Sequence, residues 1–207
     1  MICSLLINKN ILVRSCRFII SVMENTKSAS LMAASLNEFR RYKSLAERAM
    51  AQVTDDQLQV ALDPESNSIA VIIKHLAGNM RSRFMDFLTT DGEKPDRNRD
   101  SEFESPPFAR AELIQLWEVG WGYVFQALEP LTDSDLARTI HIRTEPYSVN
   151  EAIQRQLAHY AYHVGQIVFL AKHFRSAQWK SLSIPRGKSK DFDLKVARGE
   201  ASQKRVN

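Results

Sequence analysis

Cysteine is scarce in this sequence, and its placement excludes several kinds of site. The chain of 207 residues has two cysteines, Cys3 and Cys16, and both lie within the first 22 residues. The remainder of the chain therefore offers no internal disulfide, no thiolate ligand for a metal and no cysteine nucleophile. This usage suits a reducing compartment, and we expect a cytoplasmic protein.

Glycine and long apolar runs are scarce as well. Seven glycines in 207 residues argue against a glycine-rich nucleotide-binding loop and against a turn-rich β fold. No uninterrupted apolar run approaches the roughly 20 residues that a membrane-spanning helix needs. Apolar residues make up 44% of the sequence and charged residues 25%, values that are typical of a globular domain.

The charge is unevenly distributed along the chain. The net charge is +4, but residues 1–22 carry +3 and residues 172–207 carry +7, which leaves −6 on residues 23–171. A basic tail of this kind can bind nucleic acid or an anionic surface, although it is more often a solvated strap. The sequence has no recognised nucleic-acid module and little aromatic interleaving. We therefore do not expect a nucleic-acid partner.

Residues 1–22 have the features of an extension and not of a folded segment. Their basic residues follow the first apolar stretch, whereas a signal peptide has its charge first. Met23 is followed by polar residues and is a plausible natural start. We expect that residues 1–22 are not part of the fold and reflect a misassigned start codon. A weak membrane-surface or export segment is the alternative.

Apolar residues spaced three and four apart predict four long amphipathic helices. These helices cover residues 29–51, 68–88, 109–128 and 148–174. Thr54 with Gln57, and Ser148 with Glu151, have the spacing of a capping box, which marks the start of a helix. The connections are short except for a polar loop, residues 89–107. Loops of this length are usually functional or disordered, and both interpretations stay open.

Four such helices favour an all-α fold, an antiparallel four-helix bundle with its long loop between the second and third helices. Residues 140–143 are too short to be more than one strand-like stretch. We expect one domain over residues 23–190. The basic end of the chain, residues 191–207, is expected to fray.

Three histidines form the most specific pattern in the sequence. His159 and His163 are four residues apart in the fourth helix, so their side chains project from one face and are close enough to share a metal ion. His75 flanks the apolar stripe of the second helix, and bundles build metal sites from facing helices. Three imidazoles without a fourth protein ligand describe a metal site with an open position, which is the arrangement of a catalytic site.

Amide side chains lie near the three histidines in the sequence, and the histidines also have a structural interpretation. Asn79, Gln156 and Gln166 are placed to hydrogen-bond the second ring nitrogens and so fix the tautomers. A histidine pair at this spacing also arises by chance, and a lone helical histidine is more often a partly buried polar residue. From the residues alone, a metal site and structural histidines stay equally open. His141 and His173 are not expected to belong to the cluster.

The chain resembles the DinB-like superfamily of four-helix bundles, and within it an uncharacterised branch. The resemblance covers about residues 30–190, and the matching stretches are Leu36–Tyr42, Ser68–Leu76, Asp91–Asp100, Arg155–Gln166 and Leu182–Gly187. It implies that His75, His159 and His163 bind a divalent metal, commonly zinc or nickel. Neutral imidazoles also suit iron, so the metal stays open.

The superfamily includes transferases and isomerases that use low-molecular-weight thiols such as bacillithiol or mycothiol, and many members form homodimers. The resemblance therefore implies a homodimeric, metal-dependent enzyme, an S-transferase that joins such a thiol to a small electrophilic substrate or else a hydrolase. A non-catalytic dimeric scaffold or sensor is the second hypothesis. A binder that acts through the basic tail is the third. No catalytic side chain and no substrate can be named from the residues.

Overall fold

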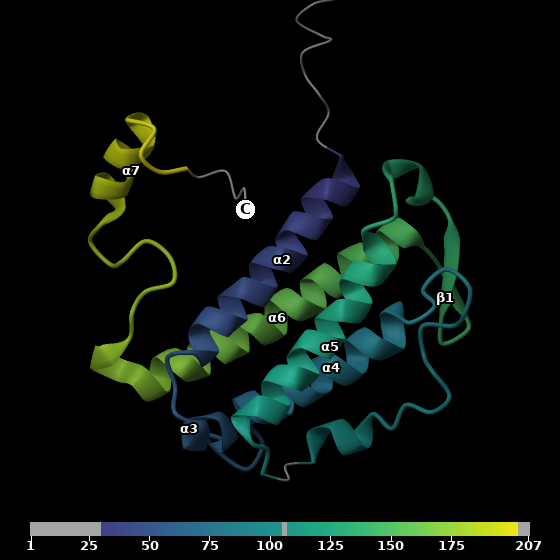
Figure 1. The fold of residues 1–207 in the computed structure, drawn as a ribbon, viewed down its shortest axis with the longest axis horizontal. Helices are drawn as coiled ribbons and strands as arrows, with labels where there is room; N and C mark the ends of the chain where they lie inside the picture. The colour runs from purple at the N-terminus through teal and green to yellow at the C-terminus, as the bar shows by residue number, and fades with distance from the viewer. Residues whose placement is uncertain (1–29, 105–106, 203–207) are drawn as a thin grey trace, which may run out of the picture. The chain divides into compact units, whose positions relative to one another are not determined.

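The computed structural model describes residues 30–104 and 107–202 (Figure 1). Over this part of the chain the protein is mostly helical, with six α-helices, three short 3₁₀ helices and one two-stranded sheet. The expected extension, residues 1–22, lies outside the described residues. None of the described helices is both long and apolar enough to cross a membrane.

The four predicted long helices are all present. They are α2 (Leu31–Met50), α4 (Ile69–Phe84), α5 (Arg110–Leu128) and α6 (Val149–Arg175). Helix α4 packs on α5, α2 packs on α6, and α6 also contacts α4 (Figure 1). Apolar side chains from all four helices meet in one core, and its largest fully buried members include Phe39, Trp117, Trp121 and Tyr160.

The predicted capping boxes determine where two helices begin. The Ser148 hydroxyl accepts a hydrogen bond from the Glu151 amide, and the Glu151 carboxylate accepts one from the Ser148 amide at the start of α6. Thr54 and Gln57 form the same reciprocal pair at α3 (Asp55–Gln59). Both capping boxes are confirmed. They leave fewer unpaired amides in the first turn of each helix.

The second helix ends earlier than predicted. Its last residue is Phe84, because Met85 is extended and Asp86 has a positive φ of 50°. Its apolar side chains Ile69, Ile73, Leu76, Met80 and Phe84 are nevertheless buried, and so is Phe87 just beyond its end.

The strand-like stretch has a partner strand, so the all-α prediction needs a correction. Strand β1 (Thr139–Ile142) pairs in antiparallel register with β2 (Glu145–Ser148). The two turn residues, Arg143 and Thr144, have positive φ angles of 55° and 67°, as a tight hairpin turn requires. The protein is thus a mostly helical structure with a small two-stranded sheet.

The long polar segment after α4 is folded where the structure describes it. It contains the 3₁₀ helix η1 (Asp100–Phe103), which packs on α4. Its Asp91 carboxylate accepts hydrogen bonds from the amides of Arg143 and Thr144, at 2.8 and 2.7 Å. The Gly92 amide donates to the His141 carbonyl at 2.7 Å. The segment is thereby joined to the hairpin turn and to α4.

The remaining short elements lie in the second half of the chain. They are η2 (Asp133–Asp135), η3 (Ser176–Gln178) and α7 (Ser189–Ala197). Trp179 and Leu182 are partly buried against the core. Helix α7 crosses the expected start of the tail at residue 191, and it has no buried residue.

Gly120 lies where α5 is in close contact with α4, and it allows a test of this packing. A Cβ atom at Gly120 would lie 3.0 Å from the Ala77 Cα and 3.1 Å from the Met80 Sδ, whereas one at Gly122 would meet no atom within 4 Å. We expect Gly120→Val to lower the free energy of unfolding by about 1–3 kcal/mol, because the side chain overpacks the contact. Gly122→Val should change it by no more than about 0.5 kcal/mol. Equal losses in urea denaturation would contradict this packing.

Candidate metal centre

Helices α4 and α6 bring the three predicted histidines together. One ring nitrogen of each of His75, His159 and His163 lies within 4.8 Å of the other two. The Nε2 atoms of His75 and His159 are 3.3 Å apart. The centroids of the three rings are 4.7 to 5.4 Å apart. His75 and His163 are buried and His159 is half-buried.

The ring of His75 is oriented by an acidic residue that the sequence reasoning missed. Nδ1 of His75 lies 2.9 Å from Oε2 of Glu102, which comes from η1. A carboxylate can only accept, so Nδ1 is the donor, and in a neutral imidazole Nε2 then carries the lone pair. Carboxylates commonly orient metal-binding histidines in this way.

Glu102 is itself held by Arg97. The Arg97 Nε donates to Oε1 at 2.8 Å and its Nη2 donates to Oε2 at 2.9 Å. The side chains of His75, Glu102 and Arg97 are only 4 to 7% exposed. Burial alone would raise the pKa of Glu102, but the hydrogen bonds from His75 and Arg97 hold this pKa below its usual value. The carboxylate is therefore ionised at neutral pH.

A glycine in α4 makes room for this carboxylate. A Cβ atom at Gly78 would lie 2.3 Å from Oε1 of Glu102. Gly78 is three residues after His75, so both face the same side of the helix. Glycine within a helix costs about 1 kcal/mol relative to alanine. At residue 78 the close approach of the Glu102 carboxylate explains why a glycine is present despite this cost.

On α6 the ring of His163 has a different partner. Its Nδ1 lies 2.7 Å from the Oε1 of Gln166, one turn along the helix. The amide oxygen accepts, so Nε2 of His163 also keeps its lone pair. The Gln166 Nε2 donates in turn to the Tyr162 hydroxyl at 3.3 Å. The predicted role of Gln166 is confirmed.

The other two predicted amides do not hold a histidine. The Asn79 Oδ1 accepts a hydrogen bond from the Tyr160 hydroxyl at 3.2 Å, so the prediction for Asn79 is wrong. The buried Oε1 of Gln156 has no hydrogen-bond partner among the described residues. It therefore accepts no bond from an imidazole.

The histidines of α6 are neutral at physiological pH. Burial, strengthened by the neighbouring histidines, lowers the pKa of His159 to about 3. Burial also lowers the pKa of His163, to about 4, although the bond to Gln166 opposes the shift. Neutral imidazole is the form that binds a metal ion.

The separation of one pair of ring nitrogens, those of His75 and His159, fits a tetrahedral ion. An ion bound to nitrogen at about 2.0–2.1 Å holds two ligand atoms roughly 3.3–3.4 Å apart. The Nε2 atoms of His75 and His159 are 3.3 Å apart. Imidazole ligands suit zinc, nickel and iron. The cluster could therefore hold a divalent metal ion.

The cluster borders a cavity of about 580 Å³. Its wall includes the three histidines, Tyr162 and Phe103, whose ring centroid lies 4.8 Å from that of His75. Five arginines complete much of the rest, namely Arg83, Arg97, Arg99, Arg143 and Arg155. A cavity of this size accommodates a small molecule. The arginines carried no periodic signal, and the sequence reasoning did not find them.

Comparison with models of known protein families shows to which family the chain belongs. The model of a family described as "Protein of unknown function (DUF1572)" matches residues 26–188. The chain belongs to this family. The part that matches DUF1572 includes all three histidines, Glu102 and the five cavity arginines. Comparisons with curated proteins and with solved structures give no match.

The contribution of the buried Glu102–Arg97 pair can be tested by measuring the free energy of unfolding. We expect Glu102→Ala to lower the free energy of unfolding by about 3 kcal/mol, because it takes a carboxylate away from a buried guanidinium. Glu104 lies two residues along and is exposed, so Glu104→Ala should change it by no more than about 0.5 kcal/mol. Denaturant unfolding in the presence of a chelator makes the comparison without any metal contribution. Similar losses in the two variants would contradict the assigned role of Glu102.

Proposed function

We propose that this DUF1572 protein is a metal-dependent enzyme of the DinB-like type. In this proposal α2, α4, α5 and α6 form an antiparallel four-helix bundle. His75, His159 and His163 bind one divalent metal ion. Zinc and nickel are the preferred ions, and iron is the alternative. The observation that carries the proposal is that three imidazoles meet at the wall of a cavity. One ring nitrogen of each lies within 4.8 Å of the other two.

The surrounding residues hold the rings ready for a ligand. Glu102 accepts a hydrogen bond from Nδ1 of His75, and Gln166 accepts one from Nδ1 of His163. Both bonds leave Nε2 available, and Arg97 keeps Glu102 ionised and in place. Phe103 packs against the His75 ring.

A divalent ion at these histidines would act as a Lewis acid and lower the pKa of a water or thiol in its open position toward neutrality. Reaction of a low-molecular-weight thiol with a small electrophilic substrate is the proposed activity, and hydrolysis is its alternative. The cavity of about 580 Å³ has room for both reactants. A cytoplasmic homodimer stays part of this proposal.

A non-catalytic scaffold is the second candidate, and one contact favours it. The 3.3 Å separation between Nε2 of His75 and Nε2 of His159 also fits a hydrogen bond between the two rings. Such a bond would satisfy both nitrogens without a metal. Metal content therefore separates the two candidates.

We expect protein purified without a histidine tag to contain about one zinc, nickel or iron per chain by inductively coupled plasma mass spectrometry. His159→Ala should lose this metal and keep its helical circular dichroism, because one of three ligands is missing. His141→Ala is the matched control, since His141 is exposed on the hairpin. Native protein that neither contains a metal nor takes one up on titration would contradict the proposal and leave the scaffold.

A second prediction concerns Glu102, the hydrogen-bond partner of the proposed metal ligand His75. Gly78→Ala should displace the end of the Glu102 side chain, because the new Cβ would otherwise lie 2.3 Å from Oε1. We expect the affinity for zinc to fall about 10–100-fold, as when a carboxylate behind a metal-bound histidine is removed. Gly122→Ala changes another helical glycine that has nothing within 4 Å. Competition with a chromophoric chelator measures both affinities, and equal values would refute the role of Glu102.

A further inference from the structure

The wall of the cavity has a strong positive charge. Among the described residues that line it are five arginines and no aspartate or glutamate. They come from parts far apart in the sequence, Arg83 from α4, Arg97 and Arg99 from the segment after it, Arg143 from the hairpin turn and Arg155 from α6. The fold thus gathers guanidinium groups from several elements around one cavity next to the histidines.

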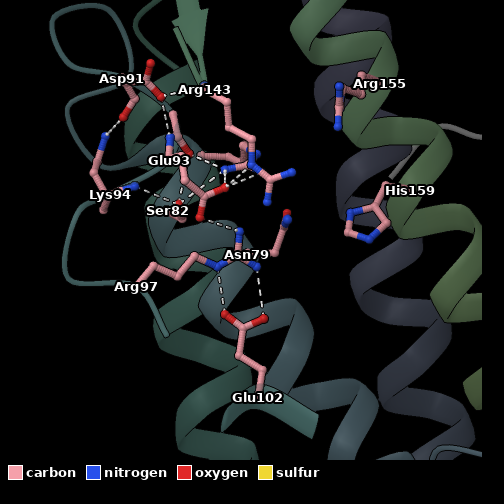
Figure 2. Close-up of polar contacts among 12 residues, drawn as sticks. Asn79, Ser82, Asp91, Glu93, Lys94, Arg97, Glu102, Arg143, Arg155 and His159 are labelled. Carbon is pink, nitrogen blue, oxygen red and sulfur yellow. Dashed lines mark hydrogen bonds and ion pairs between the residues drawn. The ribbon is translucent and has the colours of Figure 1, made fainter. Parts of the chain in front are cut away.

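Part of this positive charge is balanced by two carboxylates, Glu93 and Glu102, that do not line the cavity themselves. The Glu93 carboxylate is shared by three guanidinium groups, with ion pairs of 3.0 Å to Arg83, 3.3 Å to Arg97 and 3.0 Å to Arg143 (Figure 2). Glu102 adds a second carboxylate at Arg97. Two carboxylates therefore face three arginines. Arg83 and Arg97 are nearly buried in this group, whereas the side chain of Arg143 is 57% exposed.

The remaining two arginines have no ion pair with any residue that the structure describes. Arg155 donates to the Tyr147 hydroxyl at 3.2 Å and lies over the ring of that tyrosine. The guanidinium of Arg99 lies 4.9 Å from the centroid of the Phe103 ring. Aromatic contacts of this kind position a guanidinium without neutralising it. Both groups keep their charge for a ligand.

Arg155 is placed close to the histidine cluster. It precedes His159 by four residues on α6, so the two side chains project from the same face, about one helical turn of 5.4 Å apart. Figure 2 shows Arg155 and His159 on this helix, facing the group that contains Arg143 and Glu93. A ligand between them would have one end at arginines and the other at the histidines.

We propose that Arg99, Arg143 and Arg155 bind an oxyanion group, a carboxylate or a phosphate, on the substrate of this site. The planar guanidinium fork matches both groups and can donate two parallel hydrogen bonds to either. The anion site positions the substrate so that its reacting end meets the histidines. This second statement rests on the proposed function, whereas binding of the anion does not require a metal.

The test is a titration of the full-length protein followed by ¹H–¹⁵N nuclear magnetic resonance. The probes are succinate, inorganic phosphate and, as an uncharged analogue of succinate, succinamide. We expect saturable shifts at the amides of Arg143 and Arg155 with at least one anion and none with succinamide. The tighter anion identifies a carboxylate or a phosphate as the recognised group. Added sodium chloride should weaken binding, because it screens exposed charges. No saturable shift with either anion would overturn the proposal.

Variants separate this site from general surface charge. Arg155→Gln and Arg143→Gln should each weaken binding of the anion about tenfold or more, since each removes a charged hydrogen-bond donor. Arg48→Gln, at an exposed helical position outside the cavity, should bind as the native protein does. Unchanged affinity in both cavity variants would overturn the proposal.

The same titration distinguishes this inference from the proposed function. Both arginine variants should keep the metal content of the native protein, because neither arginine is a ligand. His159→Ala should still bind the anion after losing its metal. Anion binding in a protein that never takes up a metal would support the oxyanion site and contradict the metal enzyme. A full metal content without anion binding would overturn only the oxyanion site.

Discussion

The carboxylate of Glu102 joins helix α4 to the polar segment that follows it in the sequence. It accepts hydrogen bonds from His75 on α4 and from Arg97 in its own segment, and all three side chains are almost completely buried. An unpaired charge in such surroundings is destabilising by several kcal/mol, so these groups are stable only together. The orientation of His75, and with it the convergence of the three histidines, depends on this carboxylate and on the space that Gly78 leaves for it.

The histidines were predictable because a helix has a regular spacing, and Glu102 was not because its segment has none. His159 and His163 share a face of α6 from their separation alone, and the capping box at Ser148 marks where that helix begins. No local pattern says which acidic residue of a long polar segment reaches His75, since tertiary packing decides it. Gly78 was the available sign, because a glycine in a helix interior is unfavourable unless another group needs its space.

Tertiary contacts also explain the other differences from the sequence-based prediction. The hairpin lacks the Asn-Gly or Asp-Gly pair that signals a tight turn, and the amides of Arg143 and Thr144 are instead bound by Asp91. Asn79 lies one turn after His75, as a partner of that histidine would, yet it accepts from Tyr160 in the core. The cavity arginines come from separate elements, and only the folded chain brings them to one wall beside the histidines.

Metal binding by His75, His159 and His163 is tested most directly by extended X-ray absorption fine structure of the protein loaded with one equivalent of zinc. We predict three imidazole nitrogens at about 2.0–2.1 Å, with the remaining position taken by an oxygen ligand that the chain does not supply. His159→Ala should give a first shell with fewer imidazoles or bind no zinc. A first shell of oxygen atoms without imidazole scattering in the native protein would contradict a three-histidine site.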